Sequence, residues 1–157
     1  MSALASMVEA YLAGPGTLRQ AVQGLSREQL LARPVAGKWS TLEVVCHLAD
    51  FDPILADRMK RVIAEERPAL VGADENRFAA ALAYHERDIG EELTIIEQTR
   101  RQLSRILRKL PEAALQRVGV HSERGPRTLE QLLISAINHI PHHVKFIHDK
   151  RRALGLA

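Results

Sequence analysis

Apolar residues recur along most of the chain at intervals of three and four positions, the spacing of one face of an α-helix. Four segments with this pattern are long enough for bundle helices, at residues 4–25, 40–67, 86–110 and 128–147. Shorter helical segments are expected at residues 26–31 and 78–84. Four long helices with short connections predict an all-α fold, an antiparallel four-helix bundle with short accessory helices.

Helix starts are marked by capping residues. Ser40 is followed three positions later by Glu43, and Thr128 is followed by Gln131. Each pair predicts a capping box, in which the two side chains satisfy free backbone N–H groups at the start of a helix. Ser26 and Asp74 are further candidate caps. The second and fourth long helices should therefore begin directly after Ser40 and Thr128.

Prolines interrupt the helical pattern. Pro15 lies between two glycines and is expected to kink or split the first helix, and Pro53 should bend the second. Residues 117–125 are irregular, with alternating valines that suggest a small extended excursion. No linker or repeat divides the sequence, so residues 1–157 are expected to form a single domain.

Composition narrows the class of protein. The net charge is +3, and aromatic residues make up only 4% of the chain, which argues against a nucleic-acid-binding face. The single cysteine, Cys46, excludes an intrachain disulfide. We see neither a secretory signal nor an apolar run long enough to cross a membrane. We expect a cytoplasmic protein that binds neither nucleic acid nor membrane.

Histidines are the candidate metal ligands. His139 and His143 lie four positions apart in a helical pattern, so both rings leave the same face. His142 is also one turn from His139, but it lies about 100° from the apolar stripe that His143 joins. His47 occupies the apolar face of the second long helix. Three neutral imidazoles that converge would leave an open coordination position for water or substrate.

Two neighbouring residues are candidate catalytic groups. Asp50 lies one turn beyond His47 and could orient an imidazole, act as a general base or provide a fourth ligand, or it could be an exposed helix charge. His142 is expected at the rim, where it could move protons. Cys46 points about 100° away from His47 and is interpreted as a buried, inert thiol.

Other metal-site patterns are missing from the sequence. Neither His-Glu-x-x-His nor Glu-x-x-His occurs, which argues against a zincin protease and a ferritin-like di-iron bundle. One cysteine excludes a thiolate zinc knuckle. Glycine-rich phosphate-binding loops are also missing.

Two segments carry a family resemblance. Residues 37–50, Gly-Lys-Trp-Ser-Thr-Leu-Glu-Val-Val-Cys-His-Leu-Ala-Asp, and the closing His-x-x-His-His at 139–143 resemble the DinB/YfiT-like family of metalloenzymes. The resemblance implies an up-down-down-up-like four-helix bundle, commonly dimeric. It also implies a divalent site, with zinc or nickel held by His47, His139 and His143. Pro141 departs from the pattern and should loosen the turn by freeing the Ile137 carbonyl.

Three functions are consistent with these residues. The first is a metal-dependent enzyme acting on a small molecule, either a hydrolase or a transferase that uses a low-molecular-weight thiol. The resemblance favours the transferase, because it implies relatives with thiol-dependent activity. The second is a metal- or small-molecule-binding module without catalysis. The third is a metal-free structural bundle, which the position of Pro141 makes conceivable.

Overall fold

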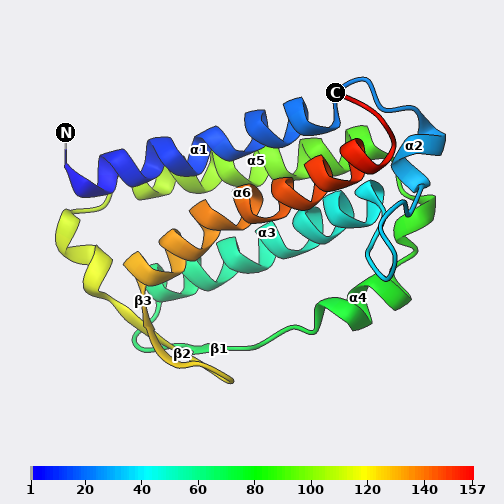
Figure 1. The fold of residues 1–157 in the computed structure, drawn as a ribbon. Helices are drawn as coiled ribbons and strands as arrows, with labels where there is room; N and C mark the ends of the chain where they lie inside the picture. The colour runs from blue at the N-terminus through cyan, green and yellow to red at the C-terminus, as the bar shows by residue number, and fades with distance from the viewer. Residues whose placement is uncertain (1) are drawn as a thin grey trace.

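Four long helices dominate the computed structural model, which describes residues 2–157 (Figure 1). They are α1 (Ala3–Val22), α3 (Thr41–Ala64), α5 (Ile89–Leu107) and α6 (Leu129–Ala153). Their buried faces carry Leu, Val, Ile and Ala at helical spacing and form the core. The predicted four-helix bundle is confirmed. Between residues 2 and 157, no helix combines the length and apolar character of a membrane span.

The helices follow an up-down-down-up course (Figure 1). α1 and α6 run in one direction, whereas α3 and α5 run in the other. Surface ion pairs fit this arrangement. Glu9 of α1 pairs with Arg108, which caps the C-terminal end of α5, and Arg19 of α1 pairs with Glu97 of α5, so the order of the partners is antiparallel. A long crossover, residues 65–88, returns the chain to the end of the bundle where α3 began.

Short helices and strands lie in the connections between the long helices. They are α2 (Arg27–Leu31), α4 (Glu75–Ala81), and the 3-10 turns η1 (Tyr84–Glu86) and η2 (Glu112–Gln116). Strands β1 (Ala69–Leu70), β2 (Val118–His121) and β3 (Gly125–Thr128) form a small sheet in that order. β1 runs parallel to β2, and β2 runs antiparallel to β3. The expected extended excursion is therefore part of a sheet that the sequence did not predict.

Capping residues are mostly where the sequence placed them. Thr128 and Gln131 form the full capping box of α6. Ser40 accepts from the Glu43 N–H at 3.1 Å, which confirms the start of α3. The second half of that predicted box is wrong, because the Glu43 carboxylate accepts from the Arg33 guanidinium instead. α4 begins after Asp74, three residues earlier than expected.

The first helix continues through Pro15, so the prediction of a split is wrong. A proline lacks the N–H that would bind the carbonyl four residues earlier, here that of Tyr11. Arg100 of α5 replaces this donor, because its Nη1 donates to the Tyr11 carbonyl at 2.8 Å. Arg100 is fully buried, pairs with Asp52 of α3 at 2.7 Å and donates to the Ala136 carbonyl of α6. One guanidinium therefore joins all four long helices.

Candidate metal centre

Three histidine rings meet between α3 and α6. His47 projects from α3, and His139 and His143 project from successive turns of α6. The Nε2 atom of His47 lies 3.1 Å from that of His139 and 3.2 Å from that of His143. The structure thus brings together the three residues that the sequence singled out as ligands.

The spacing of these atoms suits a metal ion. Nitrogen ligands about 2.05 Å from a tetrahedral zinc ion stand about 3.3 Å apart, close to the two separations observed. Within the described chain, the three histidines are the one group of potential ligands whose donor atoms all lie within 4.8 Å of one another. Three protein ligands are typical of catalytic sites, which keep a position for water or substrate.

Packing holds the His47 ring in place. His47 is only 1% exposed, and its ring centroid lies 5.4 Å from that of Trp39 and 4.6 Å from that of Phe51. The Nδ1 atoms of His47 and His139 are buried and have no hydrogen-bond partner among residues 2–157. Metal-bound histidines usually donate from the second nitrogen to an acceptor that orients the ring. Here the aromatic neighbours of His47 take over that orienting role.

All three imidazoles are neutral at physiological pH. Burial lowers the pKa of His47 to about 4, although the charge of Asp50 acts in the opposite direction. Burial and the neighbouring histidines lower the pKa of both His139 and His143 to about 3. Neutral imidazole is the form that binds metal, so the site is ready for a cation without releasing protons.

Pro141 does not break the last helix. α6 is continuous from Leu129 to Ala153, and Pro141 lies on its exposed face between the two histidines. The rings of His139 and His143 both reach His47. The expected loosening of this turn therefore does not separate the two rings.

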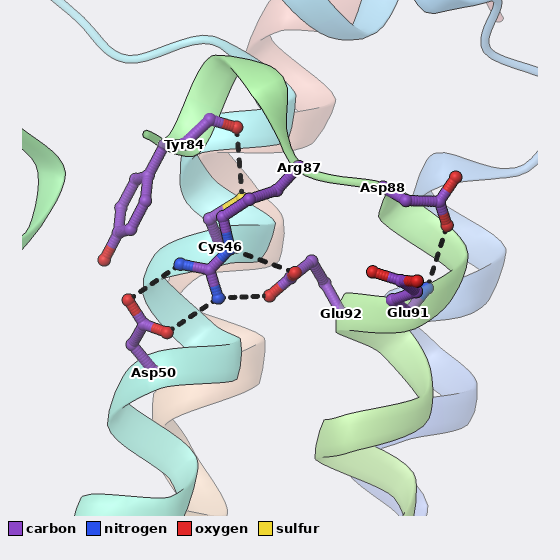
Figure 2. A network of polar contacts seen from close by, with 7 residues as sticks. All are labelled: Cys46, Asp50, Tyr84, Arg87, Asp88, Glu91 and Glu92. Atoms are coloured by element: carbon purple, nitrogen blue, oxygen red, sulfur yellow. Dashed lines mark hydrogen bonds and ion pairs between the residues drawn. The ribbon is translucent and has the colours of Figure 1, made fainter. Parts of the chain in front are cut away.

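Asp50 lies in a different network from the one its spacing suggested (Figure 2). Both of its carboxylate oxygens accept from the Arg87 guanidinium, at 2.7 and 3.0 Å. Arg87 also donates to Glu92 of α5, and these hydrogen bonds, foremost that to Asp50, raise the pKa of Arg87. Asp50 is therefore absent from the histidine group and does not bind His47 Nδ1. The network ties the loop before α5 to α3.

The other two predicted neighbours, His142 and Cys46, differ in exposure. His142 is exposed, and its ring centroid lies 5.1 Å from that of His143, at the rim of the site. Cys46 is buried and its thiol lies 3.5 Å from the Tyr84 carbonyl (Figure 2). Burial raises the pKa of Cys46 to about 12, so the thiol stays protonated and is a poor nucleophile.

Glu75 is a site residue that sequence reasoning missed. It opens α4, and its Oε2 lies 3.8 Å from His47 Nε2. Its side chain is 53% exposed, so water reaches the carboxylate. Phe78, one turn further along α4, packs on Phe51 and fixes the helix beside the histidines. No sequence signal marks Glu75, because only the crossover brings it to His47.

Two pockets adjoin the histidines, and Glu75 lines both. One, of about 370 Å³, is lined by His47 and His139 and extends toward the sheet. The other, of about 350 Å³, is lined by His142 and His143 and extends along α6. A small molecule in either pocket would therefore lie beside at least one of the three histidines.

A helical bundle with three converging imidazoles and an adjoining carboxylate defines a candidate mononuclear metalloenzyme. The sequence pattern of the DinB superfamily matches residues 10–147, so this chain belongs to the DinB superfamily. The family expected from residues 37–50 and 139–143 is thereby confirmed.

Similar sequences occur in Bacillus subtilis, Oceanobacillus iheyensis and Geobacillus thermodenitrificans. YfiT of Bacillus subtilis is 28% identical over 142 residues, covering 90% of this chain and 80% of YfiT. A protein of Oceanobacillus iheyensis is 29% identical over 133 residues, covering 85% of this chain and 77% of that protein. A Geobacillus thermodenitrificans protein is 29% identical over 143 residues, covering 90% of this chain and 80% of that protein. The names of all three describe a metal-dependent hydrolase, in each case provisionally.

The solved structure of Bacillus subtilis YfiT has a similar fold. It superimposes with a TM-score of 0.92 at 26% sequence identity, covering 100% of this chain and 91% of that one. That protein is described as "a probable metal-dependent hydrolase with an unusual four-helix bundle topology". The up-down-down-up course of this chain is thus shared with a relative.

Proposed function

We propose that this protein is a divalent-metal-dependent hydrolase of a small-molecule substrate, with the ion held by His47, His139 and His143. The convergence of three neutral imidazole nitrogens beside two pockets carries the proposal. The names of the similar proteins support it. Imidazole ligands suit zinc and nickel, and we propose one of these. When bound, such an ion lowers the pKa of water and polarises a carbonyl or phosphoryl oxygen.

Glu75 is the proposed proton acceptor. Its carboxylate is near His47 Nε2 and open to solvent, so it can take a proton from a water molecule that attacks the substrate. The protonated Glu75 can then give this proton to the leaving group, and His142, which lines the same pocket, can relay it. Asp50 is less suited to this work, because both of its oxygens are bonded to Arg87.

The thiol-dependent transferase is the second candidate. It rests on the donor set, because three protein ligands leave a position that a thiolate can occupy as readily as water. The implied co-substrate is a low-molecular-weight thiol. Both candidates need the same three histidines, so they differ only in whether turnover requires the thiol.

The deciding experiment is a steady-state assay of zinc- and nickel-loaded protein on ester and amide panels. Each substrate is tested alone and with glutathione, bacillithiol or mycothiol. We expect metal-dependent turnover without thiol, abolished in His143→Ala. Turnover only when a thiol is present would replace the hydrolase with the transferase. Bound metal without any turnover would leave a binding module.

A further inference from the structure

The pocket along α6 is lined by more cationic than anionic side chains. Two lysines, Lys38 and Lys150, line it together with the ring of His143. Glu75 is the one carboxylate among the residues that line it, and it lies on the His47 side. The pocket therefore has more positive than negative side chains, before any metal ion is considered.

Lys150 is buried without a counterion. It is 3% exposed, and its ammonium donates to the Phe146 carbonyl at 3.3 Å. Among residues 2–157, it forms no ion pair with any carboxylate. A buried ammonium that uses one of three donors on a backbone carbonyl is costly unless a further acceptor completes it. Burial is the main cause that lowers the pKa of Lys150; Asp149 and Glu43 act in the opposite direction, and Lys38 acts in the same direction as burial.

Nearby acids are already occupied. Asp149 pairs with Arg152, and Glu43 pairs with Arg33. Each carboxylate has an arginine partner, and neither forms an ion pair with Lys150. A ligand anion can supply the acceptor that these carboxylates do not.

The rest of the lining includes apolar side chains beside the polar Asn76 and His142. Trp39 and Phe146 line the pocket, and their rings lie near the metal-binding histidines. The Trp39 ring centroid is 5.4 Å from that of His47, and the Phe146 ring centroid is 6.0 Å from that of His143. A ligand that reaches from the Nε2 atoms to Lys150 would pass these two aromatic side chains.

We infer that Lys150 and Lys38 form an anion-binding subsite, and that the substrate carries a carboxylate or phosphate joined to an apolar segment. This inference rests on the proposed function, because it supplies the substrate class for that site. Its apolar segment contacts Trp39 and Phe146, and its reactive bond lies at the histidines. Lys150 thus sets specificity without taking part in the chemical step.

A binding experiment tests the subsite independently of turnover. Trp39 is the sole tryptophan, so its fluorescence reports on this pocket. Zinc-loaded protein is titrated with butyrate, butyl phosphate and, as a neutral comparison, 1-butanol. We expect an anion to bind and Lys150→Met to weaken it at least about tenfold, with Lys38→Met acting in the same direction. The anion that binds more tightly identifies the charged group.

The matched control is Lys145→Met, which removes an exposed lysine of the same helix. It should leave anion binding unchanged. Binding that Lys150→Met leaves intact would mean that the anion sits on the metal alone, and would overturn the inference. So would failure of both anions to bind.

A kinetic comparison separates this inference from the proposed function. The mono-4-nitrophenyl ester of succinate has a carboxylate where 4-nitrophenyl butyrate has its terminal methyl group. Lys150→Met should raise KM for the succinate ester and leave kcat/KM for the neutral ester unchanged. If both esters are hydrolysed and Lys150→Met lowers kcat/KM equally for the two, the subsite is overturned and the hydrolase is kept. Anion binding that depends on Lys150, with neither ester hydrolysed, would overturn the hydrolase on these substrates and keep the subsite.

Discussion

At the scale of single residues, the site depends on helical position. His143 and His142 are adjacent in sequence, yet only His143 shares the inward face of α6 with His139. That distinction could be predicted, because the apolar stripe gives the direction of each side chain. The proximity of Glu75 to His47 and the pairing of Asp50 with Arg87 could not be predicted from the sequence. Glu75 reaches His47, and Arg87 reaches Asp50, only through the folding of the crossover.

Glu75→Gln should separate metal binding from catalysis. The amide keeps the size of the side chain but accepts protons poorly, so kcat should fall about 10²- to 10⁴-fold while metal content stays unchanged. Activity assays and elemental analysis of the same preparation measure both. Glu28→Gln, an exposed glutamate in the first turn of α2, is the matched control. An unchanged kcat in Glu75→Gln would exclude this base.

The histidine pKa values predict how stability depends on pH in the metal-free protein. Unfolded histidine titrates near 6.5, whereas the folded groups titrate at about 4 and about 3. Between these values the unfolded state binds protons that the folded state does not. The free energy of unfolding should therefore fall as pH drops below about 6.5, and these groups add no pH dependence above it.

Urea unfolding of chelated protein at several pH values measures this slope. His139→Gln should flatten it, because one of the three groups no longer titrates. His85→Gln changes an exposed histidine and should leave the slope as it is. Equal slopes in wild type and His139→Gln would show that burial of these rings does not control acid stability.

At the scale of elements, the sequence predicts the long helices well and the connections poorly. Periodicity and caps such as Ser40 and Thr128 give the long helices, since each buries one apolar face over many turns. The strands are two to four residues long, too short for a periodic signal. Pro15 suggested a break in the first helix. The Tyr11 carbonyl that Pro15 leaves without a donor instead accepts from Arg100, 85 positions after Pro15, and no local sequence pattern reveals this contact.

Substitution of the buried Arg100 should therefore strongly lower the free energy of unfolding of the bundle. Arg100→Met leaves Asp52 buried without a partner and the Tyr11 carbonyl without a donor, so unfolding should require about 3–5 kcal/mol less. Chemical denaturation measures the loss. Arg19→Met, which breaks an exposed pair with Glu97, should cost about 1 kcal/mol or less. Similar losses in the two variants would contradict the central role of Arg100.

At the scale of the whole molecule, the crossover explains how the site is assembled. Residues 65–88 bring α5 back to the end where α3 began (Figure 1). They also place Glu75 Oε2 3.8 Å from His47 Nε2. The site thus combines α3 and α4 with α6, which is distant from both in sequence. The general course of the helices followed from the family resemblance, whereas the placement of α4 depends on tertiary contacts such as that of Phe78 with Phe51.

Assembly into a homodimer, and organisation as a single domain, stay predictions of the sequence. Sedimentation equilibrium should give the mass of two chains, and thermal unfolding should show one transition in both metal-free and metal-loaded protein. Added zinc or nickel should raise the melting temperature, because a ligand of the folded state stabilises it. A monomeric mass, or two separate transitions, would contradict the respective prediction.

The most direct test of the account is the metal content of purified protein beside that of His47→Ala and His143→Ala. His148→Ala, an exposed histidine of α6, is the control. Wild type and the control should carry about one divalent ion per chain, and both ligand variants should carry none while remaining helical. Wild type that stays metal-free in excess zinc and nickel, or ligand variants that keep the ion, would contradict a three-histidine metal centre.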